Sequence, residues 1–318
     1  MAPNRILRPL GIAAILLTMP GFHAGSQTAP ADKQQDPAYR LSVDVNLVVL
    51  HATVRDRQGE FAADLREQDF EVYEGGVPQH IRLFQHEDIP VTVGLVVDHS
   101  GSMRPKLRDV TAAARSFVQF SNSEDQMFIV NFNEAVSMGL PRTTPFSNKP
   151  AALAGAIWSF PAFGETALYD ALVKALAHLQ EGRWDKKVLL VISDGGDNAS
   201  SHNLAQVTNS AGRSSALIYT IGIFDEADAD RNPRVLRHLA QATGGEAFFP
   251  SQASEVVSIC QRIAREIRNQ YTIGYVPTAV HKGVYRSIRV VARQSGHDKL
   301  SVRTRSGYFS AGAPSEQN

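Results

Sequence analysis

Residues 93–103 read VGLVVDHSGSM, an apolar run followed by three oxygen-bearing side chains at alternate positions. Asp98, Ser100 and Ser102 supply one carboxylate and two hydroxyls within five residues. We expect an extended turn here, in which alternate side chains point the same way. Gly101 allows the backbone to bend tightly. The three oxygens can therefore converge on one ligand, although a polar turn after a buried strand would contain the same residue types.

Two other loops present similar groups next to predicted elements. Asp194 follows a buried strand predicted at 187–192, and Thr166 opens a helix predicted at 167–179. The five side chains offer hard oxygen donors and include no His or Cys, which favours Mg²⁺, with Ca²⁺ or Mn²⁺ as alternatives, over Zn²⁺ or Cu²⁺. Because hydroxyl ligands are neutral, a metal held this way would keep positive charge and attract a carboxylate from a partner.

The segment that must position these loops, residues 91–269, alternates apolar strands with helix-length amphipathic segments. This alternation predicts an α/β fold, a doubly wound mostly parallel sheet with helices on both faces. Ligands of such sheets bind beyond the carboxyl ends of the strands, where all three loops are expected. Strands are predicted at 91–97, 126–132, 187–192, 217–223 and 247–249, with an edge strand at 136–140, and helices at 106–120, 150–159, 167–179, 203–214, 233–243 and 255–269.

The order Asp98-x-Ser100-x-Ser102, then Thr166, then Asp194, resembles the metal-ion-dependent adhesion site of von Willebrand factor type A domains. The resemblance covers about 91–269, and the flanking strands further resemble secreted bacterial proteins described as VWFA-related. It implies that the serines and the threonine contact a divalent metal directly or nearly so. It also implies that the aspartates often act through water and that an acidic side chain of a protein partner completes the shell.

The sequence departs from that family at one point beside the site. The threonine loop often reads Gly-Gly-Thr in such domains, whereas this chain has Gly164-Glu165-Thr166. Glu165 adds a carboxylate, and it is therefore an accessory candidate, either solvated or capping the metal when no partner is bound.

The two flanks of the central segment return to the alternation of apolar and polar residues that predicts short antiparallel strands. Residues 41–90 hold 4 basic and 10 acidic side chains, a balance of −6, and residues 271–310 hold 7 basic and 1 acidic, a balance of +6. Neither flank has enough strands for a stable sheet of its own. We therefore predict one β-sandwich formed by both flanks, with the α/β domain inserted in it; two separate small sheets are the alternative.

The first residues predict export. Arg5 and Arg8 precede an apolar run from Leu10 to Met19, and small residues at 24–26 fit a cleavage site. This run is too short to cross a bilayer, which predicts no stable membrane span, although an uncleaved N-terminal anchor is an alternative. The expected location is secreted, periplasmic or extracellular. The predicted layout is signal peptide, linker, N-terminal strands, von Willebrand type A domain, C-terminal strands and tail, at residues 1–26, 27–40, 41–90, 91–269, 270–310 and 311–318.

Charge and cysteine content limit the function classes. Lys plus Arg equal Asp plus Glu at 32 each, so no basic surplus points to nucleic acid. The single cysteine, Cys260, excludes an intrachain disulfide and lies on an apolar helical stripe, which predicts a buried side chain. The acidic segment 225–230 is expected to be solvated, with a Ca²⁺ loop as the alternative.

We predict a non-enzymatic binding protein whose unknown protein partner presents an Asp or Glu carboxylate. The alternatives are a structural or assembly subunit with a closed metal site and a Mg²⁺-dependent hydrolase. The hydrolase is disfavoured because Ser100 does not lie in a G-x-S-x-G motif and the adjacent His99 cannot easily reach it.

Overall fold

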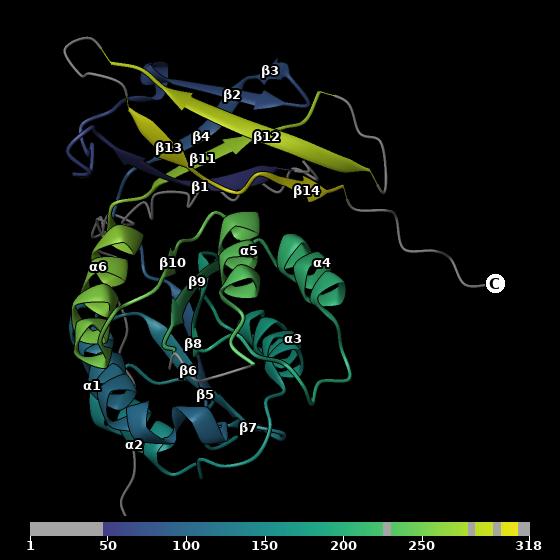
Figure 1. Ribbon diagram of the computed structural model, residues 1–318. Helices are drawn as coiled ribbons and strands as arrows, with labels where there is room; N and C mark the ends of the chain where they lie inside the picture. The colour runs from purple at the N-terminus through teal and green to yellow at the C-terminus, as the bar shows by residue number, and fades with distance from the viewer. Residues whose placement is uncertain (1–46, 225–229, 279–283, 295–299, 311–318) are drawn as a thin grey trace, which may run out of the picture. The chain divides into compact units, whose positions relative to one another are not determined.

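The computed structural model describes residues 47–224, 230–278, 284–294 and 300–310. They fall in one compact unit, Val45–Asn318, which contains an α/β domain and a β-sandwich (Figure 1). The predicted signal peptide, linker and tail, and residues 225–229 of the acidic segment, lie outside the described residues. Within the described ranges, no helix is both long enough and apolar enough to cross a membrane.

The α/β domain is built on a six-stranded sheet with the strand order β10-β9-β8-β5-β6-β7. Neighbours pair in parallel except at the edge, where β7 runs antiparallel to β6. Every residue of β5 and β8 is buried, because helices cover both faces of the sheet. The strands are β5 Thr92–Asp98, β6 Gln126–Phe132, β7 Val136–Met138, β8 Lys187–Ser193, β9 Leu217–Gly222 and β10 Ala247–Phe248.

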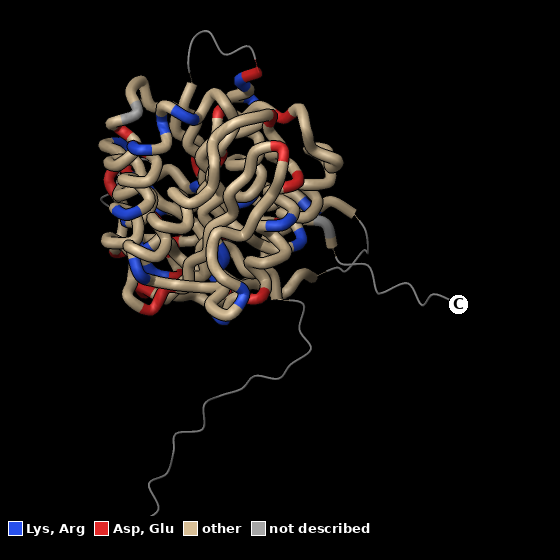
Figure 2. The backbone as a smooth tube through the Cα atoms, turned by 90° about the horizontal axis from the view of Figure 1, so that it is seen from below, with Lys and Arg blue, Asp and Glu red and all other residues tan. Residues whose placement is uncertain are grey.

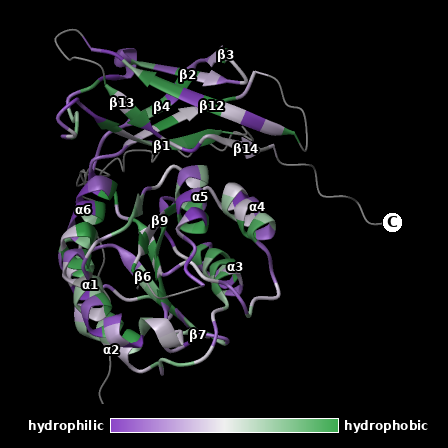
Figure 3. Cartoon of the chain, in the orientation of Figure 1, coloured by the Kyte–Doolittle hydropathy of each residue, from purple (hydrophilic) through white to green (hydrophobic). Residues whose placement is uncertain are grey.

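Two groups of helices cover the sheet, each with its own apolar core. Side chains from α1, α2 and α6 pack on one face, and side chains from α3, α4 and α5 pack on the other (Figure 1). Apart from α2, whose residues are nearly all apolar, the helices carry both hydrophobic and hydrophilic residues (Figure 3). The cover of both faces of a mostly parallel sheet confirms the predicted doubly wound fold. The helices are α1 Leu107–Gln119, α2 Pro150–Trp158, α3 Leu168–Leu179, α4 Leu204–Ser214, α5 Pro233–Thr243 and α6 Val256–Arg268.

The buried stripe of α6 contains Val256, Cys260 and Ile263, at the spacing that the sequence predicts. Cys260 is a free, fully buried thiol. Burial raises the pKa of this thiol to about 12, so it stays protonated and is a poor nucleophile. The predicted role of Cys260 as a small core side chain is confirmed.

The β-sandwich takes strands from both flanks of the α/β domain. One sheet has the order β13-β1-β11-β4 and the other β14-β12-β2-β3, so each contains strands from before and after the insertion. The alternative of two separate small sheets is therefore wrong. The strands are β1 Val48–Arg55, β2 Phe70–Glu74, β3 Val77–Gln79, β4 Ile81–Gln85, β11 Tyr271–Tyr275, β12 Tyr285–Ala292, β13 Ser301–Arg303 and β14 Gly307–Phe309.

One apolar cluster joins the two sheets of the sandwich. It includes Leu50 and Val54 of β1, Ile273 of β11 and Val290 of β12. Opposite charges of the two flanks also meet: Arg286 pairs with the buried Glu74, and Arg293 lies 3.3 Å from Glu71. Over the rest of the chain, charged residues of both signs are interspersed (Figure 2). The apolar cluster and these ion pairs therefore both hold the two flanks together.

A buried carboxylate on α6 connects the α/β domain to the sandwich. Glu266 is fully buried and accepts hydrogen bonds from Arg55 at 2.8 Å and Thr53 at 3.2 Å, both on β1, and from Tyr219 of β9 at 2.7 Å. Arg303 of β13 also donates to it. Although burial alone would raise it, the pKa of Glu266 is held below its ordinary value by Arg303 and these hydrogen bonds.

Candidate metal centre

Three loops meet at the carboxyl edge of the α/β sheet. Strands β5 and β8 are parallel neighbours, so Asp98 at the end of one and Ser193 at the end of the other leave the sheet side by side. Asp194 follows Ser193, and Thr166 lies just before α3. Asp98 is fully buried, Asp194 is 2% exposed and Thr166 is 7% exposed. The predicted site residues therefore lie on adjacent elements and under partial cover.

Hydrogen bonds link four of the five predicted residues directly. The Ser102 hydroxyl donates to Asp194 Oδ2 at 2.6 Å, and the Ser100 and Ser102 hydroxyls lie 3.1 Å apart. Asp98 Oδ1 accepts from the Ser100 backbone N–H at 2.8 Å, and its Oδ2 accepts from the Ser193 hydroxyl at 2.6 Å. The sequence analysis missed Ser193, which binds the buried carboxylate of Asp98.

The backbone that brings the two serines together differs from the expectation. The predicted extended turn is wrong, because residues Gly101–Lys106 form a 3₁₀ helix directly before α1. Ser100 is the residue before this helix, and its φ of −59° and ψ of 167° are extended. Ser100 therefore lies between β5 and the 3₁₀ helix, and Ser102 lies in the first turn of that helix. The turn of the helix, and not the alternation of an extended chain, brings the two hydroxyls together.

Backbone hydrogen bonds hold the threonine loop between the other two. The Gly101 N–H donates to the Gly164 carbonyl at 3.2 Å, and the Phe163 N–H donates to the His99 carbonyl at 3.0 Å. On the other side, the Thr166 N–H donates to Asn198 Oδ1 at 2.8 Å. Thr166 thus joins the site through these backbone contacts with the loops that carry Ser100 and Asp194.

Glu165, the accessory candidate, is exposed at the rim of this loop. Its backbone N–H donates to Glu134 Oε2 at 3.1 Å. Gly164 has a φ of +78°, a backbone conformation that favours glycine, and a Cβ there would displace the same Glu134 carboxylate oxygen, 2.0 Å away. Glu134, which the sequence analysis did not single out, therefore shapes the threonine loop.

The electrostatics of the site favour a bound cation. Burial and, after it, the neighbouring Asp194 raise the pKa of Asp98 from 3.8 to about 6. In the described part of the chain, neither aspartate forms an ion pair with Lys, Arg or His. The same ranges contain no cluster of three or more His, Cys, Asp or Glu side chains that could hold a metal. The five predicted residues supply two carboxylates and three hydroxyls. Two buried carboxylates with no cationic partner fit a divalent cation.

His99 is buried next to the site but faces away from the serines. One ring nitrogen, Nε2, lies 3.1 Å from Asn131 Oδ1, and the ring meets Phe160 edge-on. Burial lowers the pKa of His99 to about 4, so the imidazole is neutral at pH 7. The sequence disfavours His99 as a base for Ser100, and in the structure His99 anchors the loop to β6 through Asn131.

Comparisons with known proteins agree with this fold. Residues 93–196, a range that includes all five predicted site residues, match the family described as von Willebrand factor type A domain. A solved von Willebrand factor type A structure from Catenulispora acidiphila is 14% identical and covers 82% of this chain and 74% of its own, with a TM-score of 0.50. The search of curated proteins finds no match.

Two structures of proximal thread matrix protein 1 from the mussel byssus are also similar to this chain. The first is 16% identical and covers 61% of this chain and 51% of its own, with a TM-score of 0.51. The second, described as having a zinc-occupied MIDAS motif, is 14% identical over 57% of this chain and 48% of its own, with a TM-score of 0.48. Residues 93–196 are therefore similar to a von Willebrand factor type A domain, and the solved structures with TM-scores of 0.50 and 0.51 have a similar fold.

Proposed function

We propose that this protein makes divalent-metal-dependent contacts with another protein through the centre formed by Asp98, Ser100, Ser102, Thr166 and Asp194. The bound metal would take an Asp or Glu carboxylate of the partner as a further ligand. The observation that carries the proposal is the pair of buried aspartates, hydrogen-bonded to hydroxyls, that lack a cationic partner in the described part of the chain.

The small number of carboxylates supports adhesion-type binding rather than permanent metal storage. Two aspartates formally balance a divalent cation, whereas four would leave a net negative site that repels an acidic partner. The hydroxyls of Ser100, Ser102 and Thr166 add donors without adding charge. Mg²⁺ is the metal we propose first, with Ca²⁺ and Mn²⁺ as alternatives, because all the donors are hard oxygens.

The surroundings of Ser100, the serine considered as a nucleophile, support a role without catalysis. A serine nucleophile needs a neighbouring base within hydrogen-bonding distance. The Ser100 hydroxyl lies next to Ser102, while the neutral His99 is paired with Asn131. We therefore propose that the centre binds and does not hydrolyse. The signal-peptide pattern of residues 1–26 supports an extracytoplasmic site of action.

The test combines metal titration with capture. Calorimetry with Mg²⁺, Ca²⁺ and Mn²⁺ should show one site in the full chain, and Asp98→Asn should lose it. Asp170→Asn, which changes an aspartate on α3 outside the centre, is the matched control. Proteins captured from a secreted fraction in Mg²⁺ and released by EDTA should be absent with Asp98→Asn. Equal metal binding by wild type and Asp98→Asn would refute the proposal.

One observation favours an assembly subunit with a closed site as the second candidate. The Ser100 and Ser102 hydroxyls and Asp194 already satisfy one another by hydrogen bonds. A closed site would bind metal in calorimetry, yet its assembly with other subunits would persist in the presence of an acidic competitor such as free glutamate. Loss of assembly on adding that competitor would favour the adhesion-type function instead.

A further inference from the structure

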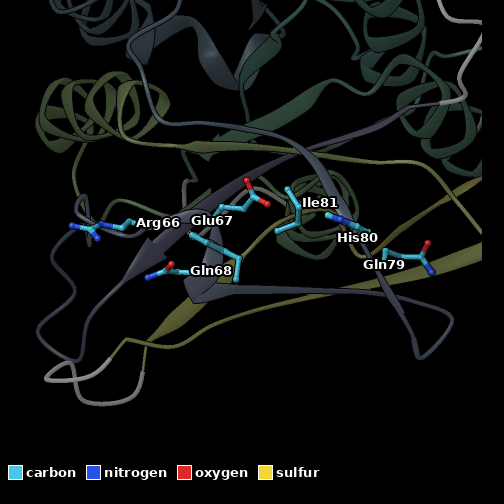
Figure 4. A pocket seen from close by; sticks show the side chains of 7 residues that line it. Arg66, Glu67, Gln68, Gln79, His80 and Ile81 are labelled. Atoms are coloured by element: carbon cyan, nitrogen blue, oxygen red, sulfur yellow. The ribbon is translucent and has the colours of Figure 1, made fainter.

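A groove beside the candidate metal centre differs from a hollow of the sandwich surface. That hollow, of about 500 Å³, is lined by Arg66, Glu67 and His80 together with amide side chains (Figure 4). Its charges have both signs and indicate no single ligand. The groove beside the centre encloses about 220 Å³ between the start of α1 and the end of α2.

The lining of this groove combines an apolar surface with two cations. Leu107 and the fully buried Ile157 contribute apolar atoms, and Trp158 stands 67% exposed. Arg104 and Arg108 are the charged residues that line it, and both are exposed. Exposed tryptophan and arginine are the residue types that most often dominate binding energy at protein interfaces.

The two arginines are available to a partner. Arg104 Nε donates to the Ala162 carbonyl at 2.9 Å, a neutral acceptor in the loop that leads to Thr166. Among the described residues, neither Arg104 nor Arg108 forms an ion pair with an Asp or Glu side chain. Their charge therefore complements an acidic partner, the same class of partner that the proposed metal centre selects.

The groove and the centre share one short stretch of chain. Ser102, Arg104 and Arg108 follow one another through the 3₁₀ helix into α1. At about 2.0 Å per residue in a 3₁₀ helix and 1.5 Å in an α-helix, Ser102 and Arg108 lie about 11 Å apart along the axis. An extended peptide advances about 3.3 Å per residue, so its third or fourth residue would reach Arg108 from the centre.

We infer that this groove is the second contact of the partner bound at the metal centre. The partner is an extended acidic segment whose first carboxylate meets the metal. A second acidic side chain, three or four residues away, lies at Arg104 and Arg108, and an adjacent apolar side chain packs on Trp158. The groove is smaller than the roughly 300–1,000 Å³ of small-molecule pockets, which fits a side chain of a peptide. This inference rests on the proposed function.

Binding of defined peptides to the full chain tests the inference. The probes are fluorescent glycine nonapeptides with Asp at position 3 and Glu-Leu, Gln-Leu or Lys-Leu at positions 6 and 7, measured by anisotropy in saturating Mg²⁺. Wild type should bind the Glu-Leu peptide about tenfold more tightly than the Gln-Leu peptide. Arg108→Glu should reverse this order in favour of Lys-Leu, and Trp158→Ala should weaken the Glu-Leu peptide about tenfold.

The control is Arg115→Glu, which makes the same charge change at an exposed position of α1 outside the groove. It should bind the peptides as wild type does. Calorimetry with Mg²⁺ should give the same affinity for all four proteins, because none of the changes touches the centre. If Arg108→Glu and Trp158→Ala bind the peptides with wild-type affinity, the groove is not the second contact of the partner. A wild type that binds Mg²⁺ but no peptide would also overturn it, whereas absent Mg²⁺ binding would overturn the proposed function itself.

Discussion

Replacing Asp98 by Asn should stabilise the metal-free protein and abolish its response to metal. At pH 7.5 the buried Asp98 carboxylate is ionised beside Asp194, without a cation to balance it. Asn has nearly the same shape and no charge. The replacement therefore removes an unfavourable buried charge in the metal-free state and, in the same step, removes one of the two carboxylates that would hold the metal.

The raised pKa sets the size of this effect. Folding raises the pKa of Asp98 from 3.8 to about 6. Since the unfolded chain is the stronger acid, the folded protein loses stability as the pH rises from 3.8 to 6, and the full penalty applies above pH 6. At about 1.36 kcal/mol per pKa unit, that penalty is about 3 kcal/mol. Asp98 accepts one hydrogen bond from Ser100 and one from Ser193, and Asn can accept only one of them. The lost hydrogen bond costs about 1 kcal/mol, so the metal-free variant should be about 2 kcal/mol more stable than wild type.

Urea unfolding at pH 7.5 measures both halves of the prediction. In EDTA, Asp98→Asn should be the more stable protein. With Mg²⁺ at a thousand times its Kd, wild type gains about 4.1 kcal/mol and should become the more stable one.

Asp170→Asn is the control for this experiment. Although burial raises it, the pKa of Asp170 is lowered to about 2 by hydrogen bonds from Ser201 and His202, so its carboxylate stabilises the fold. Asp170→Asn should be less stable to urea than wild type in both buffers, and Mg²⁺ should stabilise it by as much as it stabilises wild type. The prediction is refuted if Asp98→Asn is less stable than wild type in EDTA and Mg²⁺ raises the stability of both proteins equally.

Three further predictions follow from the same contacts. Mg²⁺ affinity should fall about tenfold per pH unit below pH 6, where a proton competes for Asp98, and calorimetry giving equal affinities at pH 7.5 and pH 5 would contradict this. Ser102→Ala, which removes the hydroxyl between Ser100 and Asp194, should weaken Mg²⁺ binding about tenfold with unchanged circular dichroism. Glu266→Gln should lower the stability by about 3 kcal/mol and Tm by about 5 °C in calorimetry, because Arg55 and Arg303 lose their charged buried partner; the exposed Glu181→Gln should leave Tm unchanged.

The sequence predicts the α/β domain well because its signals are local. The continuous apolar runs that became β5 and β8 leave no polar face, so they must lie inside a covered sheet. The carboxyl ends of parallel strands share one edge, so Asp98 and Asp194 could be expected together before any coordinates. These two statements require only strand direction and residue type.

The parts that the sequence does not predict depend on contacts between distant residues. Strands β2 and β3 form a hairpin across Gly75 and Gly76, but β4, separated from β3 by one residue, pairs with β11 in the other sheet. Strand β14 is too short for an alternation of apolar and polar residues to be recognised. It forms by antiparallel pairing with β12, in which Gly307 lies opposite Ser287. Glu134 contacts the threonine loop across 31 positions. Spacing along the chain carries no information about such partners.

The pairing of β1 with β11 also has a mechanical consequence. The chain leaves the α/β domain into Tyr271, which pairs with Ala52, while Val48 at the opposite end of the ladder pairs with Tyr275. A pull between the candidate metal centre and the residues that precede Val48 would draw these antiparallel strands past one another. Each hydrogen bond of the ladder would then resist the load at the same time, instead of opening one after another. The insertion thus connects the domain that carries the candidate metal centre to a strand pair that would be loaded in shear.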